Sequence, residues 1–135
     1  MGRRIVRLTG ALAVASWAAV AVAGVWQGAS TADGVYTTDQ ATKGKELFAE
    51  KCASCHNPEQ FTAAEWTRAY VGRPLSEVSG AMAEMPLDSP GSLTAEDVAS
   101  LIGYYLSMNK YPAGQTALSG EQEALKAIMV APLPQ

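Results

Sequence analysis

The sequence predicts an all-α fold of about four to five short helices. Three threonines are each followed, three residues later, by glutamine, glutamate or aspartate, a pattern that caps the start of a helix. Apolar residues in the last third of the chain repeat at helical spacing, whereas no run of alternating or β-branched residues predicts a strand. With 135 residues, the chain is long enough for one small domain and too short for two.

The first 23 residues have the composition of a secretory signal peptide. Three arginines precede an acid-free stretch from Leu8 to Val25 that is rich in alanine and valine. The small residues at positions 21–23 predict cleavage after Ala23 and export by the general secretory route. The stretch also approaches the roughly 20 residues that span a bilayer, so an uncleaved N-terminal anchor is the alternative.

The folded domain is expected to span residues 37–135, after a linker over residues 24–36 that lacks periodicity. Its first helix is expected to begin near Thr37, with a glutamine three residues later completing a capping box, and to run to about Lys51. Residues 113–135 are expected to form a C-terminal extension of the domain.

Two short helices are expected next. The capping pattern Thr62–Glu65 predicts a helix that runs to about Val71. A further helix is expected to start around Pro74, a residue suited to a first turn, and to run to about Ala83. Residues 84–92 contain two prolines and a glycine, which predict a loop.

The helix after this loop has the strongest support. A third capping pattern lies at Thr94–Asp97 and is followed by four apolar residues at helical spacing. These are Val98, Leu101, Ile102 and Tyr105. The helix is expected to stop at Asn109, and a weaker amphipathic segment from Gly120 to about Met129 is the last predicted helix.

Residues 52–56 read Cys-Ala-Ser-Cys-His, the attachment pattern of c-type haem. Two intervening residues place the thiols of Cys52 and Cys55 on one turn of backbone, where each can form a thioether to a vinyl group of the porphyrin. His56 then follows as the proximal ligand of the iron. The pattern predicts one covalently bound haem c and a role in electron transfer.

Two other chemistries use a Cys-x-x-Cys pattern, and the rest of the chain disfavours both. A structural zinc site needs four ligands, but Cys52 and Cys55 are the only cysteines and His56 is the only histidine. A thiol-disulfide oxidoreductase needs a βαβ context, which no segment of the sequence predicts.

Methionine is the expected sixth ligand of the iron, because the chain has no second histidine. Met85 is the preferred distal ligand since it lies in the predicted loop directly before Pro86, which favours extended backbone at Met85 and stiffens the loop. The alternative is that Met85 only fills space in the core, in which case Met82 is the next candidate.

Three further side chains are candidates for contacts with the haem propionates. They are Trp66, Arg68 and Arg73. Aromatic residues at helical spacing usually belong to the core, so a core position is the alternative role for Trp66.

The exported chain is acidic. Without residues 1–23, seven basic side chains remain against 13 acidic ones, a net charge of −6. This balance argues against nucleic acid and anionic lipid surfaces as partners, and a membrane contact is expected only if the N-terminal segment stays uncleaved. The charge is compatible with a redox partner that presents a basic docking patch, although solubility alone explains it equally well.

Over residues 37–112, the chain resembles the class I monohaem cytochromes c. In that family the N-terminal helix carries a glycine, then an aromatic and then the first haem cysteine at intervals of four residues. The matching residues here are Gly44, Phe48 and Cys52. The C-terminal helix of the family carries a leucine and, three residues later, an aromatic, which Leu101 and Tyr104 match. The resemblance implies a class I cytochrome c fold around one haem, with these two helices crossing at Gly44.

A narrower similarity runs from Met85 to Gly114 and includes the methionine-proline pair that is common at the family's axial position. This segment resembles small cytochromes and cytochrome modules associated with quinoprotein dehydrogenases of the periplasm. The resemblance implies an electron carrier rather than an enzyme, working between a periplasmic dehydrogenase and an oxidase or another cytochrome. The rival interpretation is a haem-based small-ligand sensor or peroxidase-like enzyme with an open sixth position.

The connection between the two expected iron ligands is short for this family. His56 and Met85 are 29 positions apart. The short connection leaves less chain to cover the haem and predicts an exposed haem edge.

Overall fold

A computed structural model of the protein describes residues 29–135 and confirms the all-α prediction. The α-helices are α1 (Thr38–Lys51), α2 (Ala63–Tyr70), α3 (Leu75–Met82), α4 (Ala95–Met108) and α5 (Gln122–Lys126). Two 3-10 helices, η1 (Thr31–Asp33) and η2 (Pro58–Phe61), and two short strands, β1 (Ala29–Ser30) and β2 (Ile128–Met129), complete this part of the chain. The predicted signal peptide lies outside the described residues. No helix within residues 29–135 is long and apolar enough to cross a membrane.

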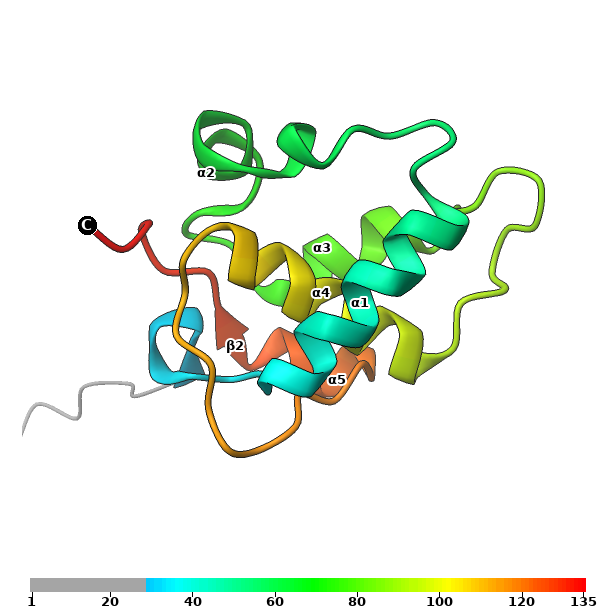
Figure 1. The fold of residues 1–135 in the computed structure, drawn as a ribbon. Helices are drawn as coiled ribbons and strands as arrows, with labels where there is room; N and C mark the ends of the chain where they lie inside the picture. Colours follow the sequence, from blue (N-terminus) through cyan, green and yellow to red (C-terminus); the bar gives the residue numbers. More distant parts are fainter. Residues whose placement is uncertain (1–28) are drawn as a thin grey trace, which may run out of the picture.

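Helices α1 and α4 cross and make the most extensive contact between elements of the described chain (Figure 1). At the crossing, a Cβ atom on Gly44 would lie 1.9 Å from the carbonyl oxygen of Ser100 and 2.9 Å from the Cβ of Tyr104. Real Cβ atoms do not approach other atoms so closely, so the crossing requires glycine at this position. Phe48, one turn further along α1, is 2% exposed and packs in the same interface.

The capping patterns of α1 and α4 form as predicted. The Thr37 hydroxyl accepts from the Gln40 backbone N–H at 3.2 Å, and the Gln40 side chain accepts from the Thr37 N–H at 3.2 Å. Thr94 and Asp97 make the equivalent pair at the start of α4, at 3.1 Å in both directions. Each pair satisfies backbone donors that have no partner inside the helix.

The capping box predicted at Thr62 is wrong, although α2 forms. The Thr62 hydroxyl donates to the carbonyl of Glu59 at 3.0 Å, and Glu65 forms an ion pair with Arg68. The first backbone N–H of the helix, that of Ala63, donates instead to the side-chain oxygen of Asn109 at 3.0 Å. A residue from the end of α4 therefore replaces the local cap.

Helix α3 packs its apolar residues Leu75, Val78 and Met82 into the core. Pro74 lies directly before the first helical residue, in extended backbone. Between α3 and α4 the chain forms the predicted loop, with no regular element from Ala83 to Thr94. Figure 1 shows this loop beside the C-terminal end of α1.

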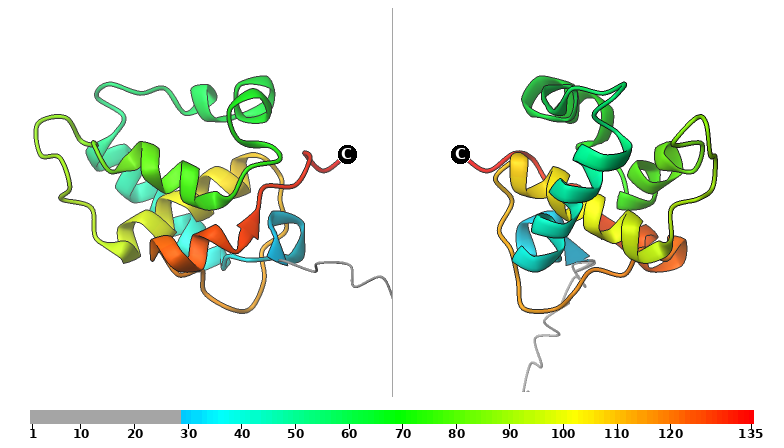
Figure 2. Two further views of the ribbon diagram at one scale, coloured as in Figure 1. Left: turned by 180° about the vertical axis from the view of Figure 1, so that it is seen from behind. Right: turned by 45° about the vertical axis from the view of Figure 1, so that its right-hand side comes forward.

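Residues 29–36 differ from the linker that the sequence predicts for residues 24–36. Strand β1 pairs in parallel with β2, placing Ala29 opposite Ile128 (Figure 2). The Thr31 side chain is fully buried, and its oxygen accepts from the Ala131 N–H at 3.0 Å. The N-terminal part of the described chain is thus packed against the C-terminal extension.

The C-terminal extension, residues 113–135, packs on the helical core. Its buried side chains are Leu118, Leu125 and Val130. The amphipathic segment predicted over residues 120–129 is shorter as a helix, because α5 ends at Lys126 and the chain continues as β2.

Candidate functional site

The Cys-x-x-Cys-His pattern forms a tight turn that continues from α1. The backbone N–H groups of Cys52 and Ala53 both donate to the carbonyl of Phe48 at 2.9 Å. The carbonyl of Cys52 in turn accepts from the N–H of Cys55 at 3.0 Å and of His56 at 2.9 Å. This turn brings the two thiols and the imidazole to one side of the molecule, as the five-residue spacing predicts.

The turn rests on a cluster of aromatic rings. Phe61 stacks on Tyr105 with ring centroids 4.6 Å apart and an interplanar angle of 4°. Phe48 meets Phe61 edge-on at 5.9 Å, and the His56 ring meets Phe61 at 5.6 Å. Burial raises the pKa of Tyr105 well above its usual range, so its phenol stays neutral. These contacts support the turn from the side of the core.

The loop between α3 and α4 brings Met85 to the same place. The Met85 N–H donates to the Met82 carbonyl at 2.9 Å, and the Ser89 N–H donates to the Pro86 carbonyl at 2.9 Å, so the loop is built from successive turns. A cleft of about 250 Å³ lies between this loop and the Cys-x-x-Cys-His turn. Its walls are Lys51, Cys52 and Ser54–His56 on one side and Met85–Asp88 and Leu93 on the other.

Of the four methionines within residues 29–135, Met85 is the one that lines this cleft. Met82 is 7% exposed and belongs to the core, and Met108 lies half-buried near the end of α4. Met129 is 42% exposed in strand β2. The location therefore favours Met85 over the alternative, Met82, as a ligand in the cleft.

The side chains of the cleft fit a c-type haem. Cys52 and Cys55 are free thiols, half-buried and exposed respectively. Burial raises the pKa of the Cys52 thiol, against a smaller opposing effect of the positive charge on Lys51. An imidazole nitrogen and a thioether sulfur, from His56 and Met85, form the donor pair that haem iron takes in cytochromes c. Leu87 is 75% exposed beside them, an apolar surface that a porphyrin could cover.

The three candidates for propionate contacts do not line this cleft. Trp66 is fully buried, and its ring N–H donates to the Tyr111 hydroxyl at 3.4 Å, which is the core role considered above. Arg68 pairs with Glu65 on the surface of α2. Arg73 pairs with Glu77 at 2.9 Å, beside α3.

Lys51 is a basic side chain that lines the cleft and that the sequence interpretation missed. Its position directly before Cys52, at the end of a predicted helix, is a signal that could have identified it. The sequence interpretation also missed Phe61, which is half-buried against the core. Its place beside His56 depends on the fold of η2.

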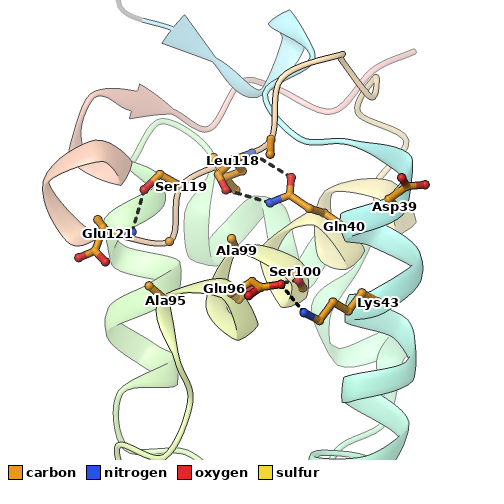
Figure 3. A pocket seen from close by; sticks show the side chains of 12 residues that line it. Asp39, Gln40, Lys43, Ala95, Glu96, Ala99, Ser100, Leu118, Ser119 and Glu121 are labelled. Atoms are coloured by element: carbon orange, nitrogen blue, oxygen red, sulfur yellow. Dashed lines mark hydrogen bonds and ion pairs between the residues drawn. The ribbon is translucent and has the colours of Figure 1, made fainter.

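A larger cavity, of about 500 Å³, lies between α1, α4 and the C-terminal extension (Figure 3). It contains no cysteine, histidine or methionine, and Lys43 forms an ion pair with Glu96 across it. Within residues 29–135, no three histidine, cysteine or acidic side chains cluster as ligands for a bare metal ion.

Comparison with known proteins gives one family match. The family described as "Cytochrome C oxidase, cbb3-type, subunit III" matches residues 39–104. This range contains all of α1 except its first residue, the Cys-x-x-Cys-His turn, the Met85 loop and most of α4. No curated protein and no solved structure matches the chain.

Proposed function

Because the chain is a class I monohaem cytochrome c that carries a covalently bound c-type haem in electron transfer, we propose that it shuttles single electrons with His56 and Met85 as the iron ligands. The observation that carries this proposal is the cleft, which the Cys-x-x-Cys-His turn and the Met85 loop enclose from two sides. When bound, the haem supplies an iron that accepts one electron and returns it.

Cys52 and Cys55 would attach the haem. The backbone N–H groups of Cys55 and His56 both donate to the Cys52 carbonyl, and this turn fixes the separation of the two thiols. Two covalent bonds on one rigid turn would hold the porphyrin in register with His56, so that attachment and ligation come from the same five residues.

His56 and Met85 would hold the iron from the two walls of the cleft. The turn of His56 is supported by Phe61, and the loop of Met85 by its own turn hydrogen bonds. Ligands held by packed or hydrogen-bonded backbone move little when the charge on the iron changes, which favours fast electron exchange. A thioether ligand also raises the reduction potential relative to a second histidine.

The exposed side of the cleft would be the route for electrons. Leu87 and Cys55 are both exposed there, in agreement with the short connection between the iron ligands. We propose that the donor is a periplasmic dehydrogenase, with a quinoprotein as the leading candidate, and that the acceptor is an oxidase or another cytochrome. The oxidase named in the matching family supports an acceptor of that class.

The predicted signal peptide supports location in the bacterial periplasm, with residues 1–23 removed or kept as a tether. Residues 37–135 remain the proposed cytochrome domain. Residues 29–36, which pack against the C-terminal extension, would belong to the same folded unit.

The attachment can be tested by mass spectrometry of the denatured protein matured in a host that makes c-type cytochromes. We expect one haem mass to remain bound to the wild-type chain, and a peptide carrying residues 52–56 to hold it. Cys52→Ser and Cys55→Ser should each keep at most one thioether. Free thiols at both positions in the matured wild type would contradict the proposal.

A further inference from the structure

We propose that Gln60 is a positioning residue for the iron ligand His56, accepting a hydrogen bond from the imidazole Nδ1–H. This inference rests on the proposed function, because it assumes that Nε2 of His56 binds the iron. Gln60 lies four residues after His56, on the 3-10 helix η2. Its Oε1 atom is 3.4 Å from the Nδ1 atom of His56.

The side chain of Gln60 is already held by the backbone. Oε1 accepts from the Asn57 backbone N–H at 3.1 Å, and the Gln60 N–H donates to the Asn57 carbonyl at 3.0 Å. A carbonyl-type oxygen has two lone pairs, so Oε1 can accept from Asn57 and from His56 at once. The amide is therefore fixed in place by the local cap of η2 before it meets the imidazole.

Helix η2 is itself anchored to the core by Asn109. This side chain is 5% exposed and donates to the carbonyl of Phe61 at 2.8 Å. Its side-chain oxygen accepts from the Ala63 N–H at 3.0 Å. The backbone of Ala63 is left-handed, with a φ of 50°. A left-handed backbone is unfavourable for alanine, so this anchor specifies the path of the chain directly after η2. The acceptor for His56 thus stands on a segment whose C-terminal end is fixed to the core.

The expected effect on the iron follows from the hydrogen bond. Histidines that bind metals usually donate their second ring N–H to an acceptor, which fixes the orientation of the ring and makes it a stronger ligand. A stronger ligand favours the oxidised iron. Loss of the acceptor should therefore raise the reduction potential of the holoprotein.

The test is the reduction potential of the holoprotein with Gln60→Leu and Gln60→Glu. We expect Gln60→Leu to raise the potential and Gln60→Glu, a stronger acceptor, to lower it. Loss of the acceptor should change the ratio of the affinities of His56 for oxidised and for reduced iron about tenfold. This change corresponds to about 59 mV in the reduction potential of a one-electron couple.

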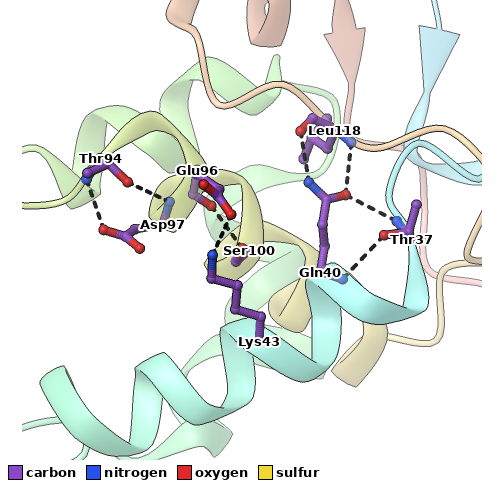
Figure 4. A network of polar contacts seen from close by, with 8 residues as sticks. All are labelled: Thr37, Gln40, Lys43, Thr94, Glu96, Asp97, Ser100 and Leu118. Atoms are coloured by element: carbon purple, nitrogen blue, oxygen red, sulfur yellow. Dashed lines mark hydrogen bonds and ion pairs between the residues drawn. The ribbon is translucent and has the colours of Figure 1, made fainter.

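Two controls separate this effect from stability and from charge. Gln40 occupies the equivalent capping-box position of α1 but its amide bonds to Leu118 (Figure 4), so Gln40→Leu should destabilise the fold and leave the potential unchanged. Glu59→Gln changes the charge on η2 without removing the acceptor. Its shift should be smaller than that of Gln60→Leu.

A second measurement does not depend on any variant. In wild-type protein, we expect NMR to show a His56 Nδ1 proton that exchanges slowly with solvent. A rapidly exchanging proton, or a Gln60→Leu potential equal to that of the wild type, would overturn the inference. A wild-type protein without His56 on the iron would instead refute the proposed function, and its absorption spectrum would reveal this first.

Discussion

The carbonyl oxygen of Ser100 on α4 occupies the space that a side chain at Gly44 on α1 would need. The distance from that oxygen to an ideal Cβ on Gly44 is 1.9 Å. The next turn of α1 leads through Phe48 to Cys52, so the position of the haem-attachment turn depends on how closely these two helices approach. A single glycine thus connects the packing of the core with the location of the site.

Gly44→Ala should destabilise the protein despite the higher helix propensity of alanine. The methyl group would force α1 and α4 apart, and we expect a loss of about 3 kcal/mol in the free energy of unfolding. Chemical denaturation of the holoprotein measures this directly.

Gly80→Ala is the matched control, because Gly80 also lies inside a helix but a Cβ there would meet nothing within 4 Å. This variant should gain about 0.5 to 1 kcal/mol from helix propensity. Equal effects of the two alanine substitutions would contradict the close approach at Gly44.

Gln40→Leu should release the C-terminal extension from α1. The Gln40 amide donates to the Leu118 carbonyl at 2.8 Å and accepts from the Leu118 N–H at 2.8 Å, as Figure 4 shows. We expect a loss of about 1 to 3 kcal/mol in unfolding free energy. Hydrogen exchange should become faster at the Leu118 amide.

Gln122→Leu changes an exposed glutamine at the start of α5 and serves as the control for the Gln40 experiment. It should leave exchange at Leu118 unchanged. Unaltered protection of Leu118 in Gln40→Leu would show that the two hydrogen bonds do not hold the extension.

Asn109→Ala should destabilise the segment that carries η2. The substitution leaves the Ala63 N–H and the Phe61 carbonyl without their partner in a partly buried setting. We expect a loss of about 3 kcal/mol in unfolding free energy. Asn109→Asp keeps an acceptor for Ala63 but loses the hydrogen bonds that the amide donates to the carbonyls of Phe61 and Tyr105, so it should not restore the wild-type stability.

Tyr36→Phe should reveal a contribution to stability that disappears at alkaline pH. The buried Tyr36 hydroxyl donates to the Tyr111 carbonyl at 2.8 Å, and burial raises the pKa of this phenol above its ordinary value of 10.0. At neutral pH the variant should lose about 1 kcal/mol.

The difference between wild type and Tyr36→Phe should stay constant below pH 10. Above pH 10, the unfolded chain loses the Tyr36 proton while the folded protein retains it. The free energy of unfolding of the wild type therefore falls as the pH rises, whereas Tyr36→Phe lacks this loss and the difference between the two narrows. Denaturation curves between pH 8 and about pH 11 measure the difference. A gap that widens with pH would contradict the direction of the pKa shift.

Local patterns allowed the helices to be predicted, and distant contacts explain the errors. The boundaries of α4 follow from the Thr94 cap and the apolar repeat within the helix itself. The cap predicted at Thr62 failed because its role passes to Asn109, 46 positions away from Ala63. Strand β1 was missed since its partner, β2, lies near the other end of the chain.

The site shows the same division. The turn of Cys52, Cys55 and His56 could be predicted because it is local to five residues, and the loop that brings Met85 to the same cleft because it contains two prolines. Their roles in haem attachment and iron ligation stay predictions. Trp66 could not be separated from the core by spacing. Its buried hydrogen bond with Tyr111 depends on a contact between residues 45 positions apart.

The absorption spectrum of the matured holoprotein, oxidised and reduced, before and after addition of carbon monoxide, tests ligation by His56 and Met85 most directly. With His56 and Met85 on the iron, the oxidised spectrum should be low-spin with a methionine-to-iron charge-transfer band, and carbon monoxide should leave the reduced spectrum unchanged. Met85→Ala should open the iron to carbon monoxide, while Met108→Ala should not. A high-spin wild-type spectrum, or ready binding of carbon monoxide, would contradict Met85 ligation and favour the sensor or peroxidase-like alternative.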